Sequence, residues 1–264
     1  MIVCFSGTGN TLFCAHKLSD ILGDEIMSLS RHMPDAPQDI HIRLKDTDRR
    51  IIWMFPVYSW GIPPAIHEIM KKATIESAAD TVHWMVATCG DDSGLTAGCW
   101  RKTMRKRGFM TAAAFCIQMP NTYTFMKGFD VDSTETETDK IVNSESRISM
   151  IARHIADNAK VPDDSIPGRY AWIKTVIVRP LFNRFLTSPK PFHASGSCTG
   201  CGLCANSCPM ENISMCKDRH PAWSNRCMMC LRCYHICPAH AVQYGRKTID
   251  KGQYRRLMDT IRQS

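Results

Sequence analysis

Residues 198–209 read CTGCGLCANSCP, and residues 227–238 read CMMCLRCYHICP. Both stretches follow one frame, C-x2-C-x2-C-x3-C-P. Three thiolates spaced two residues apart can wrap one corner of an iron–sulfur cube within a tight loop. The fourth cysteine, placed before proline, leaves that loop. The pair of runs therefore predicts two iron–sulfur sites in the carboxy-terminal part of the chain.

The spacing is that of bacterial ferredoxins, in which the fourth cysteine of each run ligates the other run's cluster. One predicted [4Fe–4S] cluster has the ligands Cys198, Cys201, Cys204 and Cys237. The other has the ligands Cys227, Cys230, Cys233 and Cys208. The alternative is a pair of structural zinc sites, which usually use isolated C-x2-C pairs rather than runs of four.

Length and composition favour a medium domain followed by a small one, since the chain has 264 residues. Residues 191–245 are too few to fold on apolar burial alone, so their clusters should act as a core. The other cysteines look like small buried hydrophobes rather than a disulfide framework; they are Cys4, Cys14, Cys89, Cys99, Cys116 and Cys216.

A reducing, cytoplasmic compartment follows from this cysteine usage. We find no signal peptide and no run of eighteen apolar residues, which favours a soluble protein. The net charge of +8 is modest for nucleic-acid binding, and we expect no nucleic-acid partner.

The chain opens with an apolar strand, residues 1–5, that runs into Ser6-Gly7-Thr8-Gly9-Asn10-Thr11 and then an amphipathic helix. Backbone N–H groups and hydroxyls at a helix N-terminus make an anion site. A P-loop is excluded because no lysine closes the loop, and Leu12 breaks the dinucleotide fingerprint. A terminal monophosphate remains.

Strand and helix patterns then alternate. We expect strands at 1–5, 25–29, 50–57, 81–88 and 109–119, and helices at 10–22, 63–73, 94–107 and 134–159. Such alternation implies a parallel, doubly wound α/β sheet, with the ligand at the carboxyl ends of its strands.

The loop Ser6–Thr11 resembles the flavodoxin phosphate loop that holds FMN. Taken with the cysteine runs, almost the whole chain resembles the flavodoxin–ferredoxin fusion proteins of anaerobic bacteria. The resemblance implies a flavodoxin-like five-stranded sheet of order 2-1-3-4-5, followed by a small α+β ferredoxin-like domain. It also implies FMN at the switch point beside strands one and three.

The loop after the third strand supplies further FMN-binding candidates, namely Pro56, Tyr58, Ser59, Trp60 and Gly61. We expect Trp60 to stack on the flavin, with ordinary packing as the alternative. Gly61 should give the backbone freedom to hydrogen-bond the reduced flavin N5.

The loop after the fourth strand contributes Thr88, Cys89, Gly90 and Asp91, and is similar to the flavodoxin loop whose backbone contacts the flavin pyrimidine edge. The side chains of Asp91 and Asp92 are expected to be helix N-caps.

Two departures from single-domain flavodoxins follow. Ser93-Gly94 stand where flavodoxins often have a tyrosine over the outer flavin face. An insertion at 119–129 brings Asn121, or Tyr123, within possible reach of the flavin, and loop packing is the alternative for Tyr123. We expect the ferredoxin-like domain or this insertion to cover the open flavin edge.

Four segments result: the flavodoxin-like domain 1–160, a connector 161–190, the ferredoxin-like domain 191–245 and a carboxy-terminal helix 246–264. The stretch 165–210 has no acidic residue and is basic and amphipathic. It could lie on an anionic membrane or an acidic partner, but we favour a bridge helix that lays its apolar face on the flavodoxin-like domain and is kinked at Pro180.

The favoured function is intramolecular electron transfer between the clusters and FMN, with an external redox partner protein. A flavin-dependent reductase of a small organic substrate, fed by its own clusters, is the alternative. A redox sensor is a third. The sequence names neither the donor nor the acceptor, nor the oligomeric state.

Overall fold

The computed structural model describes residues 1–29, 33, 36–45 and 47–258. Its amino-terminal part is a five-stranded parallel sheet of order β2-β1-β4-β6-β7. The strands are β1 Ile2–Cys4, β2 Ile26–Ser28, β4 Arg50–Pro56, β6 Val82–Cys89 and β7 Met110–Gln118. Counted along the chain, these five strands have the order 2-1-3-4-5, which confirms the predicted flavodoxin-like topology.

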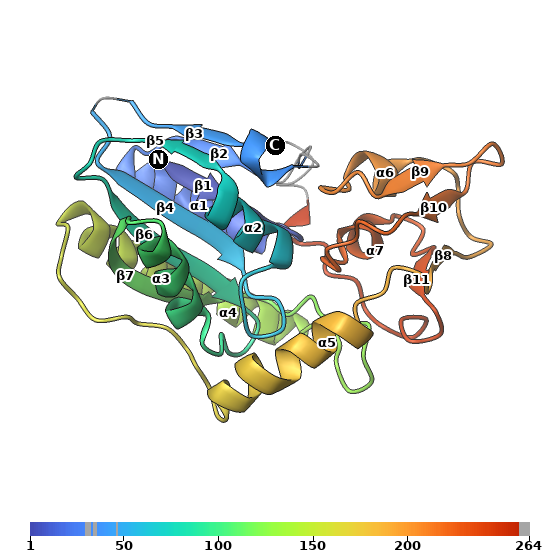
Figure 1. Ribbon diagram of the computed structural model, residues 1–264. Helices are drawn as coiled ribbons and strands as arrows, with labels where there is room; N and C mark the ends of the chain where they lie inside the picture. Colours follow the sequence, from blue (N-terminus) through green and yellow to red (C-terminus); the bar gives the residue numbers. More distant parts are fainter. Residues whose placement is uncertain (30–32, 34–35, 46, 259–264) are drawn as a thin grey trace.

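Helices cover both faces of this sheet (Figure 1). Their bounds are α1 Asn10–Leu22, α2 Pro64–Lys72, α3 Thr96–Lys106 and α4 Thr134–Ala156. One core joins α1 and α4 to alternate strand residues such as Ile52 and Met54, and the other joins α2 and α3 to Trp53 and Phe55. This alternation explains why β4 is an unbroken apolar run: each of its faces is buried against helices.

A small parallel pair, β3 His41–Arg43 and β5 Thr74–Glu76, lies beside the sheet and was not predicted. The short helix η1 Pro37–Asp39 precedes it. Each of these two strands has a single apolar residue between two polar ones, which is too little pattern to indicate a strand.

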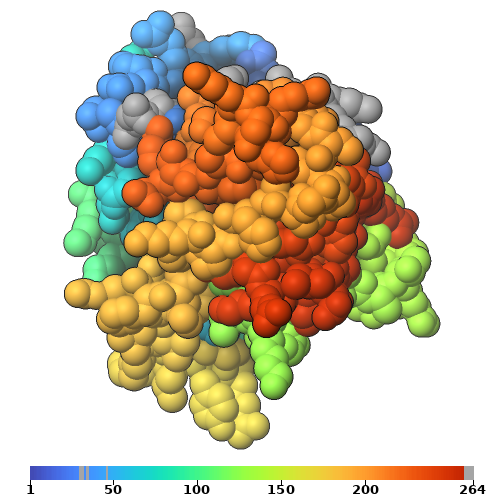
Figure 2. Space-filling model, turned by 90° about the vertical axis from the view of Figure 1, so that its right-hand side faces the viewer, coloured from blue at the N-terminus to red at the C-terminus, as the bar shows by residue number. Residues whose placement is uncertain are grey.

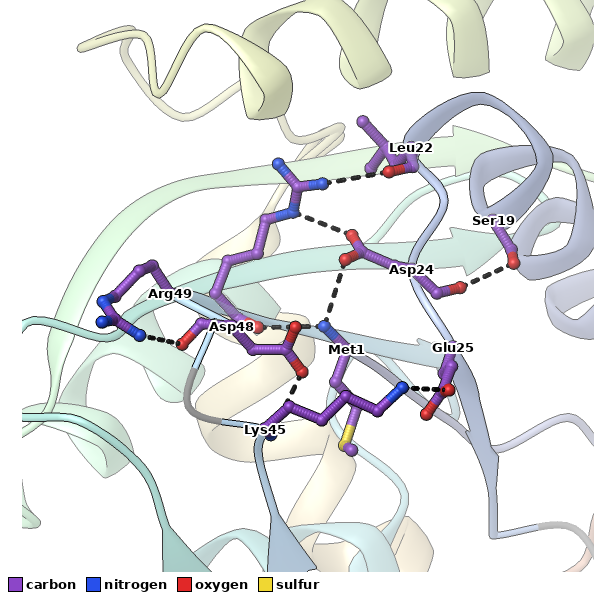
Figure 3. A network of polar contacts seen from close by, with 9 residues as sticks. Met1, Ser19, Leu22, Asp24, Glu25, Lys45, Asp48 and Arg49 are labelled. Carbon is purple, nitrogen blue, oxygen red and sulfur yellow. Dashed lines mark hydrogen bonds and ion pairs between the residues drawn. The ribbon is translucent and has the colours of Figure 1, made fainter.

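The amino-terminal ends of the parallel strands are closed by a polar network (Figure 3). The amino group of Met1 lies 3.3 Å from the Asp24 carboxylate, which also accepts a hydrogen bond from Arg50 Nε at 2.8 Å. The Ser19 hydroxyl donates to the Asp24 carbonyl at 2.6 Å. These contacts tie together the starts of β1, β2 and β4, which leaves the opposite, carboxyl edge for a ligand.

The carboxy-terminal part contains two antiparallel strand pairs and two short helices. The pairs are β8 Phe192–Ala194 with β11 Val242–Tyr244, and β9 Ile213–Met215 with β10 Pro221–Trp223. The helices are α6 Leu203–Asn206 and α7 Arg232–Ile236. This part sits at the carboxyl edge of the parallel sheet, and Figure 2 shows it covering much of that side of the molecule.

The connector forms the expected helix, but its apolar face does not lie on the flavodoxin-like domain. A π-helical stretch, η2 Ile173–Val178, continues into α5 Arg179–Phe185. Thr175 and Phe182 are buried, whereas most large apolar side chains of the helix are exposed. The wide π turns occur directly before Pro180, which has no N–H to donate back along the helix.

The predicted carboxy-terminal helix is wrong for the described residues 246–257, which form turns and extended chain. Their backbone donors are used elsewhere: Gly252 N–H bonds Asp130 Oδ1 at 2.9 Å, and Tyr254 N–H bonds His235 Nδ1 at 3.0 Å. Residues 259–264 lie outside the described part. Within the described residues, no helix has the length and apolar character needed to cross a membrane.

Candidate functional site

A cavity of about 1330 Å³ opens at the carboxyl edge of the parallel sheet. Most of the predicted FMN-binding residues line it: Ser6, Gly7, Thr8, Asn10, Thr11, Pro56, Tyr58, Ser59, Trp60, Thr88, Cys89, Gly90, Asp91 and Asn121. Two predicted residues, Gly9 and Gly61, are not among its lining. Strands far apart in the sequence thus deliver their loops to one cavity.

The loop Ser6–Thr11 is buried and held by its own polar groups. Gly9 N–H donates to Ser6 Oγ at 3.2 Å, and Thr11 Oγ1 lies 2.7 Å from Thr88 Oγ1. The Asn10 amide donates to the Pro120 carbonyl and accepts from Tyr254 Oη, at 2.8 and 2.7 Å. Asn10 therefore braces the loop from within.

The tail closes over this loop from outside. A Cβ at Gly9, whose φ is +97°, would lie 2.2 Å from the Leu257 carbonyl oxygen. Only glycine has both the conformation and the room that this approach requires. The tail was expected to be a helix with one solvated face, and its contact with the Ser6–Thr11 loop (the phosphate-type loop) was not foreseen.

Trp60 sits at the tip of a strained turn. Tyr58 and Gly61 exchange backbone hydrogen bonds at 3.0 and 3.2 Å, and the two residues between them have positive φ, 48° for Ser59 and 58° for Trp60. Non-glycine residues rarely occupy this region, and they do so mainly at functional sites. The turn brings the Trp60 ring to the cavity wall, where Lys174 Nζ lies 5.5 Å from its centroid.

The connector fills the space beside this turn. Thr175 Oγ1 donates to the Trp60 carbonyl at 3.1 Å and accepts from Leu95 N–H at 3.0 Å. A Cβ at Gly61 would lie 2.3 Å from Arg179 Nε, and one at Gly94 would lie 2.5 Å from Thr175 Oγ1. The connector therefore packs against Gly94, in the stretch where flavodoxins often have a tyrosine.

The expectation that Asp91 and Asp92 cap a helix is wrong, because the N-cap position of α3 is Leu95. Asp92 pairs instead with Lys174 of the connector. The N-cap lies three residues beyond Asp92, and the ion pair joins residues far apart in the chain.

The cysteines gather in two groups. One small cavity is lined by Cys227, Cys230, Cys233 and Cys208. The other is lined by Cys198, Cys201, Cys204 and Cys237. Each group thus contains three cysteines of one run and the last cysteine of the other, as crossed ligation requires. Among the described residues, no three His, Cys, Asp or Glu side chains form a single-ion site.

Backbone donors already point at several of these sulfurs. Asn212 N–H bonds Cys208 Sγ at 3.4 Å, Met229 N–H bonds Cys227 Sγ at 3.3 Å and Ala241 N–H bonds Cys237 Sγ at 3.3 Å. Hydrogen bonds to sulfur are a principal means of tuning iron–sulfur potentials. Four thiols and these donors fit a four-thiolate cluster in each cavity.

Burial raises the pKa of four of these thiols, those of Cys204, Cys227, Cys230 and Cys233. It raises the pKa of Cys227 to about 12 and that of Cys204 to about 11. Iron must therefore displace protons when it binds, so assembly of these centres should release protons.

The second cysteine run faces the large cavity, and the first does not. Cys227, Met228, Cys230 and Leu231 line both the large cavity and the small one, and Met229 lines the large cavity. Met229 and Leu231 have φ of 55° and 59°.

The first run has glycines at the two equivalent positions, Gly200 and Gly202, with φ of 66° and 73°. Non-glycine side chains are strained in this region, so the second run keeps strained residues where the first has permissive ones. The retained side chains are the ones that form the cavity wall.

Arg232 joins this run to the phosphate-type loop. Only 1% of its surface is exposed. Its Nε donates to the Gly7 carbonyl at 2.7 Å, its Nη2 donates to the Ser6 carbonyl and its Nη1 donates to the Ser207 carbonyl at 2.8 Å.

Sequence reasoning missed Arg232. The available signal was a cation between Cys230 and Cys233, where the first run has the apolar Leu203.

The far end of the cavity is apolar. Tyr123, Phe125 and Phe129 of the insertion line it together with Leu181 and Phe182 of the connector. The ring of Tyr123 packs against Phe125 and Phe129, with centroids 4.7 and 5.2 Å apart. Tyr123 therefore both packs within its loop and borders the cavity.

Comparison with protein families identifies two segments, residues 195–214 and 224–245, that each match a 4Fe-4S binding domain. Among curated proteins, no match is found. The chain therefore carries two ferredoxin-type 4Fe–4S domains, which the cysteine spacing predicted.

Several solved structures resemble the amino-terminal part. A flavodoxin from Streptococcus pneumoniae TIGR4 is 14% identical, with a TM-score of 0.38, over 60% of this chain and 97% of its own. A Fusobacterium nucleatum flavodoxin bound to flavin mononucleotide is 12% identical, with the same coverage of both chains and a TM-score of 0.38. A flavone reductase is 13% identical, with a TM-score of 0.37, over 61% of this chain and 63% of its own.

The fold assignment rests on the strand order of the sheet itself. A flavodoxin-like sheet followed by two 4Fe–4S domains has the architecture of a flavodoxin–ferredoxin fusion. Such an arrangement gives the chain an electron-transfer role.

Proposed function

We propose that this protein binds FMN in the large cavity and relays electrons between it and two [4Fe–4S] clusters, exchanging them with an external redox partner protein in a reducing cytoplasmic compartment. FMN exchanges one or two electrons and each cluster exchanges one, so the chemistry belongs to the cofactors. The chain's contribution is to place these groups at fixed separations and to tune them.

A single observation carries the proposal. Cys227 and Cys230 line the same cavity as Ser6, Gly7 and Trp60. A cluster held by the second run would therefore adjoin a flavin held by the phosphate-type loop. Because both belong to one chain, exchange between them would not require a bimolecular encounter.

The cavity residues divide the work of flavin binding. Backbone N–H groups at the start of α1 and the Thr8 hydroxyl suit a phosphate. The turn at Trp60 supplies an aromatic wall, and Asn121 supplies a polar amide to the same cavity. Met228 and Met229 of the second run exclude water from the side that faces the cluster.

The cluster ligands are proposed in the crossed arrangement. The lining of the two small cavities supports it, since each contains three cysteines of one run and the last of the other. The site made by the second run and Cys208 is then the one next to the flavin. The site made by the first run and Cys237 lies further along the chain of cofactors and faces the external partner.

A reductase of a small organic substrate is the second candidate, and the size of the cavity favours it. Ligand pockets usually enclose roughly 300–1,000 Å³, whereas this cavity is about 1330 Å³. Its apolar end, at Phe125 and Leu181, would suit a flat hydrophobic substrate beside the flavin. Steady turnover of such a substrate in the presence of an excess of chemical reductant would distinguish an enzyme from a carrier.

The proposal is tested by the cofactor content of protein reconstituted anaerobically. About eight irons and one FMN per chain are expected from two four-iron clusters and one phosphate-type loop. Titration with FMN should quench its fluorescence, and Thr8→Ala should weaken the binding. Stoichiometric zinc without iron would refute the cluster assignment, and absence of flavin binding would refute the assignment of the cavity.

A further inference from the structure

The connector helix presents an unusual outer face. From Trp172 to Leu186, large apolar side chains are exposed, by 38% at Val178 and by 66% at Phe185. Soluble proteins rarely leave so large a contiguous apolar surface uncovered unless it binds something. The exposed members are Trp172, Ile173, Val176, Ile177, Val178, Leu181, Phe185 and Leu186, which we call the connector face.

The position of the helix explains why this face is outward. Thr175, Arg179 and Phe182, spaced at one helical turn, point to the body: Thr175 bonds the Trp60 carbonyl, Arg179 bonds the Ile62 carbonyl and Phe182 joins the aromatic core. The opposite stripe is left over by this periodicity. Figure 1 shows η2 and α5 running along the outside of the molecule beneath both domains.

The charged residues from 165 to 190 are all basic. Arg169 and Arg184 are exposed at its two ends, stacked over Tyr170 and Phe185 with guanidinium-to-centroid distances of 4.7 and 5.6 Å. Lys190 is exposed one turn beyond the helix. Lys174 is not part of this set because Asp92 pairs with it. No acidic residue occurs from 165 to 210.

We propose that the connector face is a docking surface for an anionic lipid bilayer, on which the helix lies in the interface plane. An apolar stripe containing Trp and Phe, bordered by arginines, is the pattern of interfacial helices. The cations complement anionic headgroups. Since Leu181 and Phe185 also line the large cavity, docking would bring the rim of that cavity to the lipid.

This proposal does not rest on the proposed FMN site, and its test avoids the cavity. Ile173→Glu with Ile177→Glu alters two members of the connector face that do not line the cavity. Ile21→Glu with Val142→Glu is the matched control, because these side chains are 54% and 60% exposed on α1 and α4. Both doubles change the net charge equally.

The measurement is co-sedimentation of the full-length holoprotein with vesicles of phosphatidylcholine, with and without phosphatidylglycerol. We expect binding to the anionic vesicles that weakens in 0.5 M salt. Binding to the neutral vesicles should be weaker than binding to the anionic ones. The Ile173/Ile177 variant should bind at least about tenfold more weakly, because burial of one aliphatic side chain is worth a factor of ten or more. The control variant should bind as the wild type does.

Three results would overturn the proposal. The first is that the wild type fails to bind anionic vesicles. The second is that the two double variants bind these vesicles equally well. The third is a solution dimer, detected by sedimentation, that Ile173→Glu with Ile177→Glu dissociates, because the connector face would then be covered by a second copy of the chain.

Discussion

Replacement of Arg232 by methionine should loosen the contact between the second cysteine run and the phosphate-type loop. The change removes three hydrogen bonds from a buried guanidinium, to the carbonyls of Ser6, Gly7 and Ser207. Hydrogen bonds to a charged group contribute about 1.5–3 kcal/mol each, and the cost of burying the guanidinium offsets part of their sum, which leaves a net loss of about 3–5 kcal/mol. We expect a loss of this size in the free energy of local opening.

Native-state hydrogen exchange measures that free energy without requiring reversible global unfolding. A loss of 3–5 kcal/mol corresponds to exchange that is roughly 150- to 5,000-fold faster for amides of residues 5–12 and 228–236. Arg232→Lys should exchange at a rate between those of the wild type and Arg232→Met, since lysine keeps the charge but not the planar fork. Arg246→Met, at an exposed arginine of the same part of the chain, is the control. Equal protection in Arg232→Met and Arg246→Met would refute the reasoning.

Three further predictions follow from buried groups and from the clusters. Burial lowers the pKa of His83 to about 4, so the unfolded chain, with a histidine pKa of about 6.5, binds the extra proton between these values. The free energy of unfolding should therefore fall as the pH falls from 6.5 to 4, by up to about 3 kcal/mol. In denaturant titrations at several pH values, the unfolding free energy of His83→Gln should depend less steeply on pH than that of the wild type, and an equally steep dependence would contradict this. Gly7→Ala should weaken FMN binding by about 5- to 150-fold in a fluorescence titration, because its Cβ would lie 2.3 Å from Tyr58 Oη and overpacking typically costs about 1–3 kcal/mol. Gly98→Ala, which meets nothing within 4 Å, should leave the affinity unchanged, and equal affinities in the two variants would disprove the steric argument. Anaerobic removal of iron should abolish hydrogen-exchange protection across 191–245 while the parallel sheet keeps its own; protection that persists would show that this part folds without its clusters.

The parallel sheet could be predicted because its signals are local. The strand of residues 50–57 is an apolar run, and the helix of residues 10–22 has a regular apolar stripe, so both were found within one or two residues of their bounds. The grouping of the cysteines was equally accessible, because the spacing before each Cys-Pro dictates which loop the last thiol can reach.

The contacts between the parts could not be predicted in this way. Arg232 reaches Gly7 across 225 residues, and Tyr254 reaches Asn10 across 244. Nothing in the local pattern of either residue specifies its partner.

The connector was misjudged for a related reason. Its apolar stripe indicated burial, but Thr175 and Arg179 made the better fit to the turn at Trp60. Tertiary contacts thereby reversed the face that a periodicity argument places inward.

The most direct test of the central claim compares Cys208→Ala with Cys237→Ala in the full-length protein. Laser-flash photoreduction, followed at cluster and flavin wavelengths, measures how fast an electron moves between the two kinds of cofactor. The wild type and Cys237→Ala should show rapid first-order transfer whose rate does not depend on protein concentration, because Cys227 and Cys230 adjoin the flavin cavity. Cys208→Ala, which removes a thiol from that site, should lose the fast phase. The account is contradicted if Cys208→Ala keeps the fast phase while Cys237→Ala loses it, or if the wild-type rate rises in proportion to protein concentration.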